Sequence, residues 1–371
     1  MTLHSFRCNI TPPAVRGAHE RPRYIRCVRG LAISAHGGLE RLEYRTDLPV
    51  PALRSDTDVR VRVRAAALNH LDLFVLAGMP GVTIEPPWIM GADATGVIDD
   101  VGSAVTSVRP GDRVVVNPGL SDRTCEYCHA GEQSLCVRFR LLGEHQPGTM
   151  AEYVVVPATN VRTIPEEVPD DAAAAFTLVT LTAWRMVVTR ARVRPGEQVL
   201  IQGIGGGVAL AALQICKQIG ARVWATSRSE EKLARARSLG ADETVNTATH
   251  NVAREVRART NRRGVDVVVD TVGAATWPAS LGALGRAGRL VTCGATSGPN
   301  VETDARRLFW NQWTIMGSTM GSDAEFDAVV AQLREGHLRP PIDRVYPIAD
   351  GRSAFERLHA AAQFGKIVIT I

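Results

Sequence analysis

The sequence lacks a run of 18 apolar residues, so none of its segments has the length and character of a membrane-spanning helix. It also lacks an even, regularly spaced set of cysteines. Seven cysteines are present, three of them clustered and the others, Cys8, Cys27, Cys216 and Cys293, scattered. This usage argues against a disulfide framework and for metal binding in a reducing compartment. We therefore expect a cytoplasmic protein with no membrane partner.

Positive charge is in mild excess, at a formal net charge of +5, and lysine is far rarer than arginine. A protein that binds nucleic acid needs a clustered basic stripe, and none is evident beyond the N-terminus, so we expect no nucleic-acid partner. A solvated basic surface explains the excess. A site that attracts a phosphorylated anion is the alternative.

The first 27 residues carry five arginines against one acidic residue, Glu20. They lack the apolar run of a secretory signal. We expect residues 1–27 to be a disordered extension or an over-long start ahead of Val28, with a transit peptide as the alternative.

A chain of 371 residues is too long for one ordinary core and suits two domains. From Val28 to about Pro157, runs of strand length are separated by Gly, Pro, Asp and Asn. The alternating "VRVRVRA" is typical of a half-buried strand, and "HLDLFVLAG" of a short helix closed by a glycine. This half predicts a distorted β-barrel.

The second half has a different pattern. "DAAAAFTLVTLTAWRMVV" predicts helix, and from Glu197 onward apolar strands alternate with amphipathic helices. Such alternation predicts an α/β fold, with a parallel sheet covered on both faces. The last run, "GKIVITI", predicts a final strand.

A glycine-rich turn joins a strand to a helix in "VLIQGIGGGVALAALQICKQIG". Glycines at such a turn let the backbone approach a pyrophosphate, and the N-terminal amides of the helix point at its negative charge. The strand–turn–helix context makes the motif specific. We expect the following residues to bind a dinucleotide cofactor: Gly203, Gly205, Gly206, Gly207 and Val208.

The end of the next strand, "ARVWATS", indicates which dinucleotide binds. NAD sites usually place Asp or Glu there to bind the ribose 2′-hydroxyl. This chain has Ser227 and Arg228 instead, with Lys232 one turn into the following helix. A carboxylate would repel a 2′-phosphate, whereas these side chains can hold one, so we predict NADP(H). The alternative is that Arg228 and Lys232 are solvated surface charges.

Taken together, the barrel, the cysteine cluster and the nucleotide motif resemble the medium-chain dehydrogenase/reductase family. The marks that carry this resemblance are "AAALNHLDL", "IMGADATGVIDDVGSAVTSVRPGDRV", "GTMAEYVVVP", "LTAW" and "GKIVI". The resemblance implies a GroES-like β-barrel catalytic domain (28–170 and 319–371) and a Rossmann doubly wound parallel sheet (171–318). It also implies an active site between the two domains, and a homodimer or homotetramer formed through the edge strand "WTIMGS".

Zinc members of the family hold a catalytic zinc with three ligands. The corresponding positions here are Asn69, Ala92 and Leu178, none of which supplies a zinc-binding sulfur, imidazole or carboxylate. Asp93 keeps only the acidic position of its motif. The resemblance therefore implies a member without catalytic zinc.

Cys125, Cys128 and Cys136 have the spacing of metal ligands. In the family a four-cysteine loop binds a structural zinc, and the position of its first cysteine is Asp122 here. A carboxylate oxygen can bind zinc, so we expect one structural zinc per chain, held by Asp122 and the three cysteines. His129 is a less natural ligand, and a metal-free loop is the alternative.

Without a metal to stabilise an alkoxide, alcohol oxidation is disfavoured. The zinc-independent branch of the family, which includes quinone oxidoreductases and enoyl reductases, transfers hydride to a C=C bond conjugated with a carbonyl. The developing enolate oxygen then needs only hydrogen-bond donors. Asn69 suits that role by similarity to quinone-reductase-like members. His70 and His145 are the candidate proton donors, and Asp72 is expected to tether the short helix.

We therefore predict an NADPH-dependent reductase of an apolar, carbonyl-conjugated small molecule: an enone, a quinone or an enoyl thioester. The alternatives are a zinc-dependent alcohol dehydrogenase and a non-catalytic NADPH-binding protein. By family analogy, the following residues should line the cofactor: Thr182, Val272, Gly273, Cys293, Gly294 and Ala295. Cys293 is expected to be an apolar wall and not a nucleophile, because hydride transfer needs no thiolate.

Overall fold

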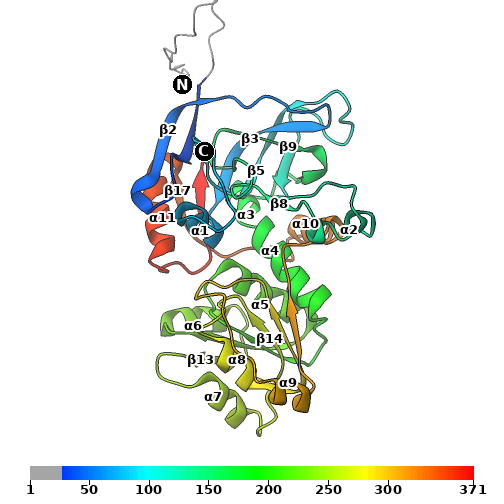
Figure 1. The fold of residues 1–371 in the computed structure, drawn as a ribbon, viewed down its shortest axis with the longest axis vertical. Helices are drawn as coiled ribbons and strands as arrows, with labels where there is room; N and C mark the ends of the chain where they lie inside the picture. The colour runs from blue at the N-terminus through cyan, green and yellow to red at the C-terminus, as the bar shows by residue number, and fades with distance from the viewer. Residues whose placement is uncertain (1–26) are drawn as a thin grey trace, which may run out of the picture.

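The computed structural model describes residues 27–371, which form two lobes joined by several crossings of the chain (Figure 1). The upper lobe in Figure 1 is built mainly of antiparallel strands, and the lower lobe surrounds a parallel sheet. The predicted α/β fold with a β-barrel and a doubly wound sheet is confirmed. None of the helices in residues 27–371 is long and apolar enough to cross a bilayer.

The barrel lobe is organised around β3, which pairs with β5, β9 and β18 in one sheet of order β10-β6-β5-β3-β18-β17. Smaller sheets of order β2-β1-β4 and β7-β8 complete the lobe. The strands are β1 Cys27–Ile33, β2 Leu42–Pro49, β3 Asp58–Ala67, β4 Trp88–Ile89, β5 Asp93–Val101, β6 Arg113–Val116, β7 Gly119–Leu120, β8 Arg140–Leu141, β9 Tyr153–Pro157, β10 Val161–Thr163, β17 Ile342–Pro347 and β18 Lys366–Thr370. The helices of this lobe are α1 His70–Ala77, α2 Glu126–His129, α3 Asp170–Ala174 and α11 Gly351–His359.

The alternating sequence of β3 explains its central place. Val59, Val61 and Val63 are buried, whereas Arg62 and Arg64 point outward and are exposed. Since successive side chains of a strand point to opposite faces, the valines form one wall of the barrel core and the arginines face water. The predicted half-buried strand is confirmed.

The second lobe holds six strands in the order β13-β12-β11-β14-β15-β16, every neighbouring pair parallel. Its central strands are buried on both faces: Val199 to Ile201 and Val267 to Val269 are fully inaccessible. The strands are β11 Gln198–Ile201, β12 Arg222–Ser227, β13 Glu243–Asn246, β14 Val265–Asp270, β15 Leu284–Thr292 and β16 Thr314–Gly317. The helices are α4 Thr177–Trp184, α5 Gly207–Ile219, α6 Glu230–Ser238, α7 Val252–Arg259, α8 Trp277–Ala283 and α9 Ala305–Asn311. Helix α10, Asp323–Arg334, follows the sheet and lies beside α2 and α4 (Figure 1).

The chain enters the parallel sheet after α3 and α4 and leaves it after β16. β17 and β18 then return to the barrel, where β18 pairs antiparallel with β3. The predicted boundaries at 170/171 and 318/319 fall in these crossings and stay predictions. β16 is an edge strand of the parallel sheet, as predicted for "WTIMGS".

The helical run predicted after Asp170 is confirmed and forms α3, α4 and a π-helical turn, Arg185–Arg190. One expectation needs correction in detail. Cys27, placed in the N-terminal extension by sequence, opens β1. The rest of that predicted extension, residues 1–26, lies outside the described residues. Short 3₁₀ turns occupy Leu39–Arg41, Gln133–Leu135, Ala158–Asn160 and Ile348–Asp350.

Candidate active site

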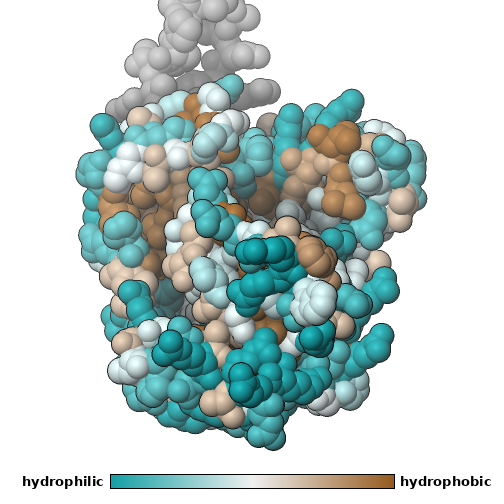
Figure 2. All heavy atoms as spheres, turned by 60° about the horizontal axis from the view of Figure 1, so that its bottom comes forward, coloured by the Kyte–Doolittle hydropathy of each residue, from teal (hydrophilic) through white to brown (hydrophobic). Residues whose placement is uncertain are grey.

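A cleft with a volume of about 1800 Å³ runs between the lobes. Helix α1 and the segment around Leu39 line it on the barrel side, and the turn between β11 and α5 lines it on the other side. Figure 2 shows the outer surface of the parallel-sheet lobe as mainly hydrophilic, with hydrophobic residues gathered in the upper part of the view. A cleft between domains is the usual place for a cofactor and a small molecule to meet.

The glycine-rich turn lies in this cleft as predicted. Gly203 and Gly205 adopt positive φ angles of 67° and 129°, which favour glycine, and α5 begins at Gly207. A Cβ atom on Gly207 would lie 2.7 Å from Val179 Cγ1 and 3.0 Å from Lys366 Cδ, so only glycine fits there. With Gly206 and Val208 these residues line the cleft and present the first amides of α5 to a bound anion.

The end of β12 carries no acidic residue toward the cleft. Ser227, Arg228 and Lys232 all line it. Lys232 already donates a hydrogen bond from Nζ to the carbonyl of Ala361 at 2.7 Å, and burial lowers its pKa. Arg228 is exposed and bonds to no other residue within 27–371, so its guanidinium is available to a ligand.

Four of the six residues predicted to line the cofactor do line the cleft: Thr182, Val272, Cys293 and Gly294. Gly273 and Ala295 lie behind this lining. A Cβ atom on Gly273 would come within 3.0 Å of Ala295 Cα. Burial raises the pKa of the Cys293 thiol to about 12, so this group stays protonated at neutral pH. A protonated thiol is consistent with the expected apolar wall.

Three buried polar side chains, Asn69, Asp93 and Lys366, are joined by hydrogen bonds at the barrel side of the cleft. Lys366 Nζ donates to Asn69 Oδ1 at 2.6 Å and to Asp93 Oδ2 at 3.0 Å, and Asn69 Nδ2 donates to Asp93 Oδ2 at 2.9 Å. Lys366 is 3% exposed, Asp93 0% and Asn69 7%. We call Asn69, Asp93 and Lys366 the ammonium cluster. Asp93 also accepts a hydrogen bond from the amide of Leu178 at 2.8 Å, so the ammonium group lies among side chains that include a single carboxylate and no sulfur or imidazole ligand.

Sequence reasoning missed Lys366, although it quoted "GKIVI" as a family mark. It also missed Gln363, which is 5% exposed, lines the cleft, and has an Oε1 atom that accepts no hydrogen bond from residues 27–371. Gln363 precedes β18 and Lys366 is its first residue, so both are far in sequence from the glycine-rich turn. Only the return of the chain through β18 brings them to the cofactor side of the cleft.

The two histidine candidates are placed differently. His70 opens α1 and lines the cleft beside Asn69, and its imidazole has no hydrogen-bond partner within 27–371. Burial, and secondarily the charge of Lys366, lowers the pKa of His70, so the imidazole is neutral at pH 7. His145 is not among the residues that line the cleft, and its Nδ1 accepts a hydrogen bond from the amide of Leu141 at 3.2 Å. The structure does not bring His145 next to Asn69.

Asp72 is placed as expected, at the start of α1. Its Oδ2 accepts a hydrogen bond from the backbone amide of Asn69 at 2.7 Å. Burial raises the pKa of Asp72 to about 7. The carboxyl group therefore ties the first turn of α1 to the chain that precedes it.

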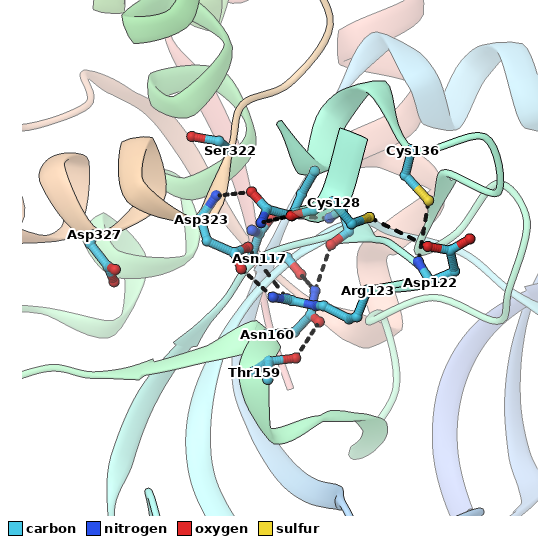
Figure 3. Close-up of polar contacts among 12 residues, drawn as sticks. Asn117, Asp122, Arg123, Cys128, Cys136, Thr159, Asn160, Ser322, Asp323 and Asp327 are labelled. Carbon is cyan, nitrogen blue, oxygen red and sulfur yellow. Dashed lines mark hydrogen bonds and ion pairs between the residues drawn. The ribbon is translucent and has the colours of Figure 1, made fainter. Parts of the chain in front are cut away.

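The cysteine loop forms a compact donor set on the barrel lobe (Figure 3). One ligand atom from each of Asp122, Cys125, Cys128 and Cys136 lies within 4.8 Å of all the others. Cys125 Sγ and Cys128 Sγ lie 3.5 Å apart, close to the spacing of about 3.8 Å that two thiolates have when each lies about 2.3 Å from a tetrahedral zinc ion. Cys136 Sγ accepts hydrogen bonds from the amides of Asp122 and Arg138, an arrangement that stabilises a thiolate. His129 is not part of this donor set.

The same loop is fastened to the helices that connect the lobes. Arg123 pairs with Asp323 at the start of α10, whose amide also donates to Gln133 Oε1 at 3.1 Å (Figure 3). Glu132 accepts a hydrogen bond from Arg185 at 2.5 Å, and Arg185 in turn donates to Glu325 at 2.7 Å. The loop thus holds α10 and the π-helical turn after α4 against the barrel lobe.

Comparisons with known proteins agree with this arrangement. Residues 207–335 match the family model described as zinc-binding dehydrogenase, and residues 55–166 match that of the alcohol dehydrogenase GroES-like domain. An acryloyl-coenzyme A reductase of Metallosphaera sedula is 31% identical over 317 residues, which cover 84% of this chain and 92% of that protein. A human quinone oxidoreductase is 26% identical over 351 residues, covering 93% and 98%.

Among solved structures, one titled as an NAD-dependent alcohol dehydrogenase superposes with a TM-score of 0.88 at 44% identity. The match covers 92% of this chain and 99% of that one. Similar proteins thus carry the names acryloyl-coenzyme A reductase, quinone oxidoreductase and alcohol dehydrogenase, so the names alone do not identify one reaction.

Proposed function

Because this chain belongs to the medium-chain dehydrogenase/reductase family and is an oxidoreductase, we propose that it transfers hydride from NADPH to an activated C=C bond without catalytic zinc. The substrate class is an enone, a quinone or an enoyl thioester. The observation that supports the proposal is the ammonium cluster, in which Lys366 and Asn69 offer no zinc ligand and Asp93 is the single carboxylate, already bonded to the ammonium.

The residues of the cleft fit a nicotinamide dinucleotide. The amides at the start of α5 would hold the pyrophosphate, and Ser227 and Arg228 would hold the 2′-phosphate of NADPH. The partnerless Oε1 of Gln363, buried beside the glycine-rich turn, would accept a hydrogen bond from a ribose hydroxyl. When bound, the reduced nicotinamide supplies a hydride to the electron-poor β-carbon.

The chain itself would supply a hydrogen-bond donor and a dry pocket. The apolar side chains of Leu71, Leu141 and Leu178 line the cleft and exclude water. The sequence assigned the enolate donor to Asn69, but its Nδ2 donates to Asp93 at 2.9 Å and to the carbonyl of Ala67 at 3.4 Å. We therefore assign the donor to the neutral imidazole of His70, whose ring nitrogens have no other partner in residues 27–371, with water protonating the α-carbon.

The test is NADPH oxidation against a panel of quinones and enones, with zinc content measured on the same preparation. We expect turnover with at least one acceptor at no more than one zinc per chain. Tight NADPH binding with no turnover on any acceptor would instead support a cofactor-binding protein.

A zinc-dependent alcohol dehydrogenase is the second candidate, and the name of the 44% identical structure favours it. That function requires a second zinc per chain and loss of activity on chelation. The positions of its ligands hold Asn69, Ala92 and Leu178, so a zinc site would need donors that these residues do not offer.

Two further features are part of the proposal. One structural zinc per chain would be held by Asp122 and the three loop cysteines. A second copy of the chain would pack on the edge of the parallel sheet, where Phe309 and Trp310 of α9 are 67% and 68% exposed next to β16. This surface would make the protein a homodimer or part of a homotetramer.

A further inference from the structure

Every donor of the Lys366 ammonium group is in use. Nζ donates to the carbonyl of Leu68 at 2.7 Å, to Asn69 Oδ1 at 2.6 Å and to Asp93 Oδ2 at 3.0 Å. An ammonium group has three donors and no acceptor, so none remains for a substrate or cofactor. Lys366 therefore cannot act on a reacting atom directly, and its buried charge must have another use.

The ammonium group fixes the orientation of the Asn69 carboxamide. Because Lys366 can only donate, it must face the amide oxygen, and the amide nitrogen must then face Asp93 and the carbonyl of Ala67. Turning the nitrogen into the cleft would remove one hydrogen bond from Lys366 or from Asp93, while these two groups stay paired with each other at 3.0 Å.

The same contacts hold the chain just before His70. Lys366 binds the carbonyl of Leu68 and the side chain of Asn69, while Asp72 binds the Asn69 amide. His70 is the next residue and the first of α1, so its backbone position is set by these bonds.

The charges around His70 come from several elements. Lys366 on β18 lowers the pKa of His70, in addition to the larger effect of burial. Asp93 on β5 and Asp72 on α1 are the nearby carboxyl groups, and Glu40 lines the same cleft. Asp93 balances the ammonium charge, so exchanging either partner changes the field at His70.

We propose that Lys366 is a positioning residue for the reaction: its ammonium locks Asn69 and the start of α1 so that His70, and not Asn69, presents a donor to the substrate carbonyl. This inference rests on the proposed reductase function, but it can be tested apart from it.

The experiment compares three proteins with the wild type: Asp93→Asn, the neutral pair Asp93→Asn/Lys366→Met, and a control pair Lys217→Met/Asp242→Asn. The control removes the 2.7 Å ion pair between Lys217 and Asp242, which lies on the surface of the parallel-sheet lobe. The titration of His70 is followed by NMR, with His70→Gln used to assign its signal.

We expect the pKa of His70 to fall further in Asp93→Asn, where the ammonium is unbalanced, and to rise in the neutral pair. The control pair should leave it unchanged. With an enone that the wild type reduces, kcat of the neutral pair should drop about 100-fold, the size expected for losing an oxyanion donor. The pH at which kcat/KM changes should move with the pKa of His70.

An unmoved His70 titration in both Asp93 variants would overturn the inference, and Asp93→Asn alone suffices if the neutral pair does not fold. If the wild type reduces no acceptor, the proposed function fails. The His70 pKa in Asp93→Asn and in the neutral pair would still show whether Lys366 is coupled to His70.

Discussion

Arg228 offers the sharpest prediction about cofactor choice. It is exposed at the carboxyl end of β12, lines the cleft, and bonds to no other residue in the described part of the chain. A hydrogen bond between charged groups contributes about 1.5–3 kcal/mol, and exposure to water places Arg228 at the lower end of that range. Since about 1.4 kcal/mol is a factor of ten, Arg228→Ala should raise the KM for NADPH about tenfold.

The same substitution should leave the KM for NADH unchanged, because NADH has no 2′-phosphate for Arg228 to bind. Initial rates at a fixed, saturating acceptor concentration would give both constants. Arg262→Ala is the matched control, since Arg262 is an exposed arginine that precedes β14 and therefore lies at the opposite end of the parallel sheet. Equal losses with NADPH and NADH, or no loss with either, would refute the assignment of Arg228 to the 2′-phosphate.

Four more predictions follow from the contacts above. Cys128→Ser should lower the zinc content below one ion per chain in elemental analysis. It should also speed amide hydrogen exchange in the first turn of α10, because the cysteine loop is bonded to that turn. An unchanged zinc content would contradict the donor set. His70→Gln should reduce kcat about 100-fold with little change in NADPH affinity, and it should also remove a loss of stability at acid pH. The pKa of His70 is lowered in the folded chain, so the unfolded chain binds the proton more readily. The free energy of unfolding of the wild type should therefore fall as the pH drops below about 6.5. The same pH dependence of unfolding in the wild type and in His70→Gln would contradict this. Phe326→Ala should lower the free energy of unfolding by about 3–5 kcal/mol in urea titrations, because Phe326 is fully buried; a change under about 1 kcal/mol would show that the α10 contacts are loosely packed. If the proposed homo-oligomer forms through α9 and β16, Trp310→Asp should yield a monomer in light scattering, and an unchanged oligomer mass would contradict this interface.

Local patterns were enough to predict most of the fold. The alternation in β3 and the strand–turn–helix order at the glycine-rich turn depend on neighbours in sequence, and both predictions are confirmed. The helical composition after Asp170 also predicted the structure of that segment, but not its interruption: α3 ends at Ala174, α4 begins at Thr177, and residues 185–190 form a wider π-helical turn.

The site was harder to predict, because its key contacts join residues nearly 300 positions apart. Lys366 meets Asn69 only because β18 pairs with β3, and no periodicity in either segment signals that contact. The family resemblance identified Asn69 as a donor by similarity to quinone-reductase-like members. The direction of its amide is set by Lys366, which only the three-dimensional structure could show.

The identity of the reduced bond tests the central claim most directly. An α,β-unsaturated aldehyde such as 2-hexenal can be reduced at C=C, giving the saturated aldehyde, or at the carbonyl, giving the allylic alcohol. With NADPH and protein containing at most one zinc per chain, we predict the saturated aldehyde as the product in gas chromatography. Allylic alcohol as the main product, formed only when a second zinc is bound, would contradict a reaction built on His70 and the ammonium cluster.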